Sequence, residues 1–156
     1  MQNRAEIQAG AETAGTPDGE GSAAVVDRVF TVMVIDDSKT IRRTAESLLR
    51  NAGFDVVTAM DGFEALSKIA DYRPDLIFMD IMMPRLDGYQ TCALIKHHHV
   101  FKHTPVVMLS SKDGLFDRAR GRVVGSDHYI TKPFTREELL AAIEQHGSQA
   151  TPGSDI

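Results

Sequence analysis

The sequence lacks the features of a membrane-spanning, secreted or disulfide-linked protein. No apolar run approaches the about 20 residues that a membrane helix needs, and residues 1–28 have no apolar block like that of a secretory signal. We therefore expect a cytoplasmic protein. The single cysteine, Cys92, has no partner for an internal disulfide, and no histidine and base are spaced around it as for a cysteine nucleophile. We interpret it as a packed core thiol.

An excess of charge is also missing from the central part of the chain. The net charge of −5 comes mostly from the two ends, so residues 29–146 are nearly neutral. This balance does not favour nucleic acid binding, which relies on a basic surface. Neither end shows a sustained apolar period. We therefore predict one domain at 29–146, a disordered N-terminal tail at 1–28 and a flexible C-terminal tail at 147–156.

Between the tails, short apolar runs alternate with amphipathic stretches, and no internal repeat is present. The runs predict strands at 30–35, 54–59, 75–79, 105–109 and 127–131. The amphipathic stretches predict five helices, at 41–52, 62–70, 86–98, 115–123 and from Thr135 onward. Strict alternation of strand and helix is typical of a parallel sheet with helices on both faces. The expected fold class is therefore α/β, with a doubly wound five-stranded parallel sheet.

Polar side chains stand where four of the five predicted strands end. Asp36 and Asp37 follow the first strand, Asp80 the third, Ser110 the fourth and Lys132 the fifth. In an open parallel sheet, ligands bind beyond the carboxyl ends of the strands. Three carboxylates at one edge repel one another unless a cation lies among them, and Mg²⁺ suits an all-oxygen site. The sequence thus predicts a magnesium site at this edge.

The same residue types suit phosphoryl transfer to a carboxylate. One aspartate can act as a nucleophile and form an acyl phosphate, while the cation screens the charge of the transferred group. Lys132 would add a second positive charge and Ser110 a hydrogen-bond donor to the same oxygens.

Four segments resemble the response regulator receiver domains of two-component signalling. They are Asp36-Asp37-Ser38, the segment from Asp80 to Gly88, Ser110-Ser111 after a strand, and the segment from Gly125 to Phe134. The resemblance covers about residues 30–146. It implies a CheY-like, flavodoxin-like fold with strand order 2-1-3-4-5, an order known from the family.

The resemblance also implies roles for the acidic residues. Asp80 would be the phosphoacceptor and thus the modified residue. Asp37 would bind Mg²⁺ directly and Asp36 mostly through water, and the backbone carbonyl of Met82 would complete the protein's share of the ligands.

The remaining motif residues would sense the phosphoryl group. Lys132 would neutralise it, and the Lys132–Pro133 bond would be cis. Ser110 would be the switch hydroxyl, and Tyr129 would turn inward to fill the space that Ser110 leaves. The readout would be the face around the predicted helix 115–123, the last strand and the last helix. Such a chain is not an enzyme, although it assists its own phosphorylation and dephosphorylation.

Within this family, two segments resemble the single-domain regulators of type IV pilus twitching motility. They are Asp87 to Lys96 and Ser110 to Asp117, and no output domain accompanies them. This similarity implies a CheA-like histidine kinase as phosphodonor and a downstream protein target in the pilus machinery.

Two other functions use related sheets. A haloacid-dehalogenase-like Mg²⁺-dependent phosphatase needs Asp-x-Asp after its first strand, but residue 38 is Ser, and no cap insertion is present. A flavodoxin-like FMN carrier needs a phosphate loop rich in Ser, Thr and Gly, where Asp36-Asp37 would repel the phosphate.

Two local alternatives remain. Asp37 or Ser38 could simply cap the first helix. The histidines at 97, 98, 99 and 103 suggest a metal site, although no carboxylate or cysteine completes one.

Overall fold

A five-stranded parallel sheet forms the centre of the fold in the computed structural model, which describes residues 29–111, 120 and 122–147. The strands are β2 (Thr31–Ile35), β3 (Asp55–Ala59), β4 (Leu76–Asp80), β5 (Val106–Ser110) and β6 (His128–Thr131). Their order in the sheet is β3-β2-β4-β5-β6. The predicted strands and the order 2-1-3-4-5 are thereby confirmed.

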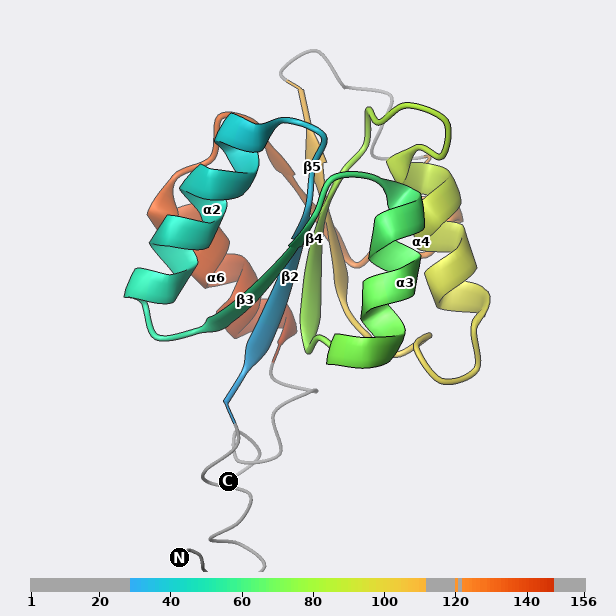
Figure 1. Ribbon diagram of the computed structural model, residues 1–156, viewed down its shortest axis with the longest axis horizontal. Helices are drawn as coiled ribbons and strands as arrows, with labels where there is room; N and C mark the ends of the chain where they lie inside the picture. Colours follow the sequence, from blue (N-terminus) through green and yellow to red (C-terminus); the bar gives the residue numbers. More distant parts are fainter. Residues whose placement is uncertain (1–28, 112–119, 121, 148–156) are drawn as a thin grey trace, which may run out of the picture. The chain divides into compact units, whose positions relative to one another are not determined.

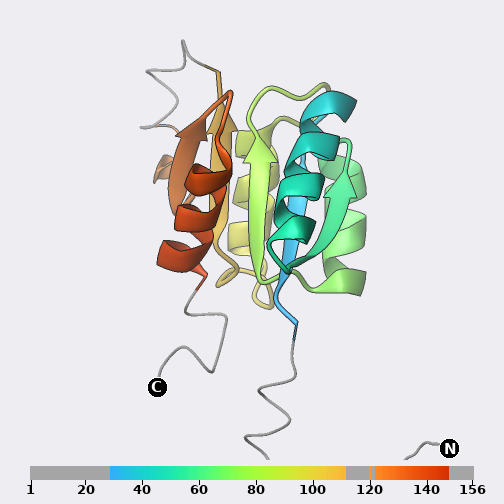
Figure 2. The same cartoon turned by 90° about the vertical axis from the view of Figure 1, so that its left-hand side faces the viewer.

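Helices cover both faces of this sheet. The described residues contain α2 (Lys39–Asn51), α3 (Gly62–Tyr72), α4 (Gly88–His97) and α6 (Arg136–His146). α2 and α6 lie on one face, and α3 and α4 lie on the other (Figures 1 and 2). None of these helices has the length and apolar character that crossing a membrane requires.

Each face of the sheet has its own apolar core, because successive strand residues point to opposite sides. Val34 and Phe78 pack with Leu49 of α2 and Leu139 of α6. On the other face, the core contains Met33, Met79, Ile69 of α3 and Ile95 of α4, among others. β4 and most of β2 are buried throughout, as expected of central strands covered on both faces.

Side-chain caps determine where the helices begin. Ser38 caps α2, and its hydroxyl accepts a hydrogen bond from the Ile41 amide at 3.3 Å. Of the two capping alternatives, Ser38 is thus the cap. Asp87 caps α4 in a capping box with Gln90, so this helix begins at Gly88, slightly later than the predicted start at 86.

The predicted helix at 115–123 lies largely outside the described residues. Of that stretch the structure describes Arg120, Arg122 and Val123, which are helical. The predicted tails also lie outside the described residues, apart from Gly147, whose amide donates to the Ile143 carbonyl at the end of α6.

Candidate functional site

Three aspartates meet at the carboxyl edge of the sheet. Asp36 and Asp37 follow β2, and Asp80 is the last residue of β4, the neighbouring strand. One carboxylate oxygen from each lies within 4.8 Å of the others, the only such group of three or more possible ligands among the described residues. Asp36 and Asp80 are buried, at 0% and 2% exposure, whereas Asp37 is exposed. The cluster is thus open to solvent on the side of Asp37.

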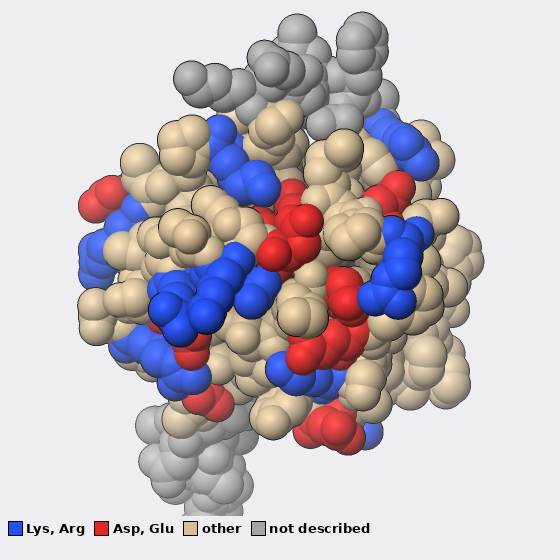
Figure 3. All heavy atoms as spheres, turned by 45° about the horizontal axis from the view of Figure 1, so that its top comes forward, with Lys and Arg blue, Asp and Glu red and all other residues tan. Residues whose placement is uncertain are grey.

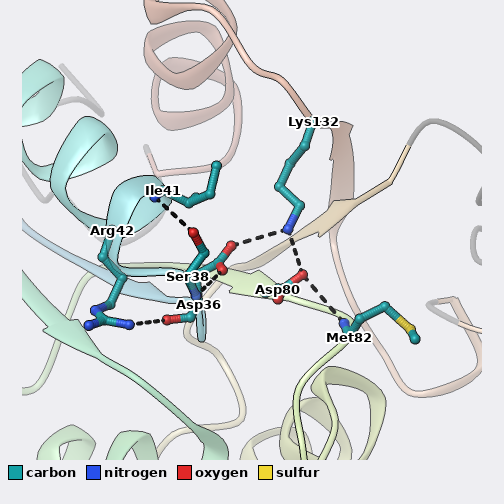
Figure 4. A network of polar contacts seen from close by, with 7 residues as sticks. All are labelled: Asp36, Ser38, Ile41, Arg42, Asp80, Met82 and Lys132. Atoms are coloured by element: carbon teal, nitrogen blue, oxygen red, sulfur yellow. Dashed lines mark hydrogen bonds and ion pairs between the residues drawn. The ribbon is translucent and has the colours of Figure 1, made fainter.

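Lys132 enters the cluster from the end of β6. Its Nζ donates to Oδ1 of Asp80 at 2.9 Å and to Oδ2 of Asp36 at 3.3 Å (Figure 4). The peptide bond between Lys132 and Pro133 is cis, as the family resemblance implied. One ammonium therefore bridges the two buried carboxylates.

The surroundings shift the pKa values of this pair. Burial raises the pKa of Asp80, and the charge of Asp36 raises it further. The hydrogen bond from Lys132 lowers it, and the resulting pKa is about 6. Burial lowers the pKa of the Lys132 ammonium, but the hydrogen bond to Asp80 and the two carboxylate charges outweigh it and raise the pKa overall. At neutral pH, Asp80 is mostly ionised and Lys132 is cationic.

Local hydrogen bonds fix Asp36. Its Oδ1 accepts from the Ser38 amide at 2.9 Å, and its amide donates to the Ala59 carbonyl at 3.1 Å. Nη1 of Arg42 donates to the Asp36 carbonyl at 2.8 Å (Figure 4). Arg42 was not predicted from the sequence as a site residue. Its position one turn into a helix that begins beside an acidic pair was a usable signal.

The loop after Asp80 is tightly closed at its base. The Gly88 amide donates to the Ile81 carbonyl at 2.8 Å, and Gly88 leaves no space for a Cβ beside the backbone of Asp80 and Ile81. Met82 lies within this loop; its amide donates to Oδ1 of Asp80 at 3.4 Å, and its side chain points away from the cluster (Figure 4). Gly88 thus allows the loop to fold closely around the acidic site.

The two predicted switch residues lie on neighbouring strands. Ser110 ends β5 and is 2% exposed, and Tyr129 on β6 is half-buried against the core that includes α3 and α4. Ser110 pairs in register with Thr131, two residues after Tyr129. Because alternate strand residues share a face, Ser110 and Tyr129 lie on the same side of the sheet.

The histidines do not join a metal site in the structure. His97, His98, His99 and His103 are all exposed, and no three possible ligands from this region converge within the described residues. His98 and His99 instead stack with ring centroids 5.1 Å apart.

The donor set of the cluster fits a hard divalent cation. All three side-chain ligands are carboxylates, which Mg²⁺ prefers over nitrogen or sulfur ligands. Figure 3 shows acidic side chains gathered in the middle of this face, with Lys and Arg on either side. A cation and an anionic group such as a phosphoryl group can be bound here together.

Comparisons with known proteins agree with this geometry. The family model of the response regulator receiver domain matches residues 32–144. The protein PilG of Pseudomonas aeruginosa is 72% identical over 121 residues, which is 78% of this chain and 90% of PilG. The alkaline phosphatase synthesis transcriptional regulatory protein PhoP of Bacillus subtilis is 38% identical over 128 residues, 80% of this chain but 52% of PhoP.

Solved structures show the same fold. The chemotaxis protein CheY4 of Vibrio cholerae aligns with a TM-score of 0.73 and 33% identity, covering 76% of this chain and 99% of CheY4. Receiver domains are signalling domains that bind Mg²⁺ in an acidic pocket and act between a histidine kinase and a downstream target. The match to the family model and the high identity to PilG show that the chain belongs to the response regulator receiver domain family.

Proposed function

We propose that Asp80 accepts a phosphoryl group from a histidine kinase in a reaction that requires Mg²⁺. The observation that carries this proposal is the arrangement of Asp80, which is buried beside two further carboxylates and within 2.9 Å of the Lys132 ammonium. A carboxylate with a cationic neighbour and a place for a metal ion is suited to attack phosphorus.

The metal ligands follow from the same cluster. We assign Asp37, the exposed member, as a direct Mg²⁺ ligand together with Asp80, and the buried Asp36 as a ligand mostly through water. The backbone carbonyl of Met82 completes the set. When bound, the cation screens the negative charge of the incoming phosphoryl group.

The residues of the chain perform the remaining steps. A carboxylate oxygen of Asp80 forms the new P–O bond as the P–N bond to the donor histidine breaks, and the electron pair stays on the histidine nitrogen. The raised pKa of Asp80, about 6, still leaves the carboxylate ionised and nucleophilic at neutral pH. Lys132 neutralises the transferred group, and Ser110 donates a hydrogen bond to it.

Phosphorylation is then communicated through Ser110 and Tyr129. Movement of the Ser110 hydroxyl toward the phosphoryl group leaves space on the side of the sheet that Tyr129 shares. A pocket of about 320 Å³ lies along the edge strand β6, lined in part by Tyr129 and by Glu138 of α6. Rotation of Tyr129 would change the shape of this pocket and thus of a protein-binding surface.

The biological role proposed is type IV pilus twitching motility. It is supported by the 72% identity to PilG over most of both chains. On this basis the phosphodonor is a CheA-like histidine kinase, and the downstream target belongs to the pilus machinery. We infer a cytoplasmic location from phosphoryl transfer between this kinase and the chain. We also infer that the chain turns over no external substrate, although it assists its own phosphorylation and dephosphorylation.

The direct test is phosphorylation by a small donor. Incubation with acetyl phosphate and Mg²⁺ should add the mass of one phosphoryl group to the wild type, and the addition should disappear with EDTA. Asp80→Asn should gain no mass. The matched control is Asp87→Asn, because Asp87 is a helix cap and asparagine caps equally well. Equal labelling of Asp80→Asn and the wild type would refute the proposal.

The motility role has a separate test. In a strain without the native regulator, the wild-type gene and Asp87→Asn should restore twitching zones, and Asp80→Asn should not. Full restoration by Asp80→Asn would exclude phosphorylation at this residue as the signal for twitching.

A further inference from the structure

Two arginines in the described residues have a positive backbone φ, Arg73 at 46° and Arg85 at 67°. This conformation is unfavourable for a residue that carries a Cβ. Arg73 ends α3, where a left-handed residue commonly terminates a helix. Arg85 terminates no helix. It lies in the loop that follows Asp80, between β4 and α4. Unfavourable backbone of this kind persists where surrounding contacts hold it.

The side chain of Arg85 supplies such contacts. Its Nη2 donates to Oδ2 of Asp61 at 2.9 Å, and its guanidinium carbon lies 5.0 Å from the ring centroid of Phe63. The Asp61 side chain is 16% exposed and the Arg85 side chain 66%, so water screens this ion pair mainly on the Arg85 side. We call the contacts among Arg85, Asp61 and Phe63 the Arg85 clamp.

Asp61, the partner of Arg85, is itself held in place at the start of α3. Oδ1 of Asp61 accepts from the Glu64 amide at 2.8 Å and so caps α3, while Oδ2 binds Arg85. A Cβ at Gly62 would collide with Thr91 and Leu86, which shows how closely the start of α3 packs against α4 and the loop before it. α3 and α4 lie side by side on one face of the sheet (Figure 1).

The loop that the clamp holds carries a proposed metal ligand. Its base is closed by the hydrogen bond between Ile81 and Gly88, and Met82, a residue that is 73% exposed, lies just inside this closure. The exposed Met82 side chain provides little packing to fix its own peptide. The orientation of the Met82 carbonyl therefore depends on the neighbouring loop residues, which include the buried Ile81 and Met83 as well as Arg85.

We propose that Arg85 is a positioning residue for the divalent cation: the Arg85 clamp holds the loop so that the Met82 carbonyl keeps one arrangement beside Asp80. This inference rests on the proposed function, in which that carbonyl is a ligand. Residues that orient ligands typically change metal affinity by about 10–100-fold when they are replaced. We expect an effect near the lower end, about tenfold, because the carboxylates remain in place.

The test measures metal affinity in the absence of phosphoryl transfer. Mn²⁺ is titrated into the unphosphorylated full-length protein, the free ion is counted by electron paramagnetic resonance, and Mg²⁺ affinity follows from competition. The variants are Arg85→Gly, which removes the clamp and relieves the backbone, and Arg73→Gly, which relieves the other positive φ away from the site. Asp61→Asn retains a helix cap but loses the charge that Arg85 binds.

The predicted result separates affinity from stability. Arg85→Gly should bind Mn²⁺ about tenfold more weakly than the wild type, while its melting temperature stays the same or rises. Asp61→Asn should also bind more weakly, and Arg73→Gly should bind like the wild type. The inference is overturned if Arg85→Gly and Arg73→Gly have the same affinity. A wild type that binds no ion would overturn the proposed metal role as well, whereas equal binding by all variants would overturn only the inference.

Discussion

The Nζ of Lys132 donates a 2.9 Å hydrogen bond to the carboxylate of Asp80, although the two residues are 52 positions apart in the chain. Parallel strands bring them together, because Asp80 ends β4 and Lys132 follows β6, with β5 between these strands. The contact places a fixed positive charge beside the proposed phosphoacceptor. Its electrostatic consequences can be measured without a phosphodonor.

The raised pKa of Asp80 predicts a pH-dependent gain in stability for Asp80→Asn. Because the pKa is about 6 in the folded protein against an ordinary value of 3.8, the folded state binds the proton more tightly than the unfolded state. The stability from this group is complete below about pH 4 and is lost as the pH rises through 6. Asparagine does not titrate. Relative to the wild type, the free energy of unfolding of the variant should therefore rise by up to about 3 kcal/mol between pH 4 and pH 8.

This comparison is made by urea unfolding in EDTA, so that no cation compensates the carboxylates. Asp87→Asn, at a partly exposed helix cap outside the acidic cluster, is the control for replacing an aspartate by asparagine. A constant difference between Asp80→Asn and the wild type across this pH range would show that the Asp80 pKa is ordinary.

Removing the Lys132 ammonium should destabilise the protein and make its stability depend on Mg²⁺. Lys132→Met leaves the buried carboxylates of Asp36 and Asp80 without their shared cation. We therefore expect the free energy of unfolding in EDTA to fall by about 2 kcal/mol. Added Mg²⁺ should recover part of this loss by binding the folded state.

The matched control for this variant is Lys68→Met. Lys68 forms an ion pair with Glu64 at 3.2 Å on the partly exposed side of α3, so its loss should be smaller and independent of Mg²⁺. If Mg²⁺ stabilises the Lys68 and Lys132 variants by the same amount, Lys132 has no special relation to a metal site.

Cys92 should be chemically inert in the folded protein. The side chain is fully buried, and burial raises the pKa of the thiol to about 11. Because the thiolate is the reactive form, a disulfide reagent at pH 8 should modify Cys92 only in urea. Rapid modification of the native protein would mean that the core around α4 opens readily.

The strands and their carboxyl-end residues could be predicted from the sequence because burial on both faces gives nearly continuous apolar runs. The polar residue that ends such a run is then conspicuous, as with Asp80 after Leu76–Met79. The capping residue of α2 could not be predicted, since Asp37 and Ser38 both cap well. Backbone geometry decides it in favour of Ser38.

No sequence motif assigns a role to either arginine around the site, and only the position of Arg42, near the start of a helix beside the acidic pair, indicates one. Arg42 and Arg85 reach polar partners through long side chains whose course depends on loop geometry, and an isolated arginine in a sequence usually indicates only a solvated surface. The four histidines show the opposite case. Their spacing suggested ligands, but the end of α4 and the following turn leave them exposed without a completed site.

The most direct test of Asp80 as the phosphoacceptor is to locate the phosphoryl group. The wild type is phosphorylated with acetyl phosphate and Mg²⁺, the acyl phosphate is reduced with borohydride, and the modified residue is identified by peptide mass spectrometry. Reduction is expected at Asp80 alone, with no modification in EDTA or in Asp80→Asn. Modification at Asp36, at Asp37 or at a histidine, or at Asp80 without Mg²⁺, would contradict this role of Asp80.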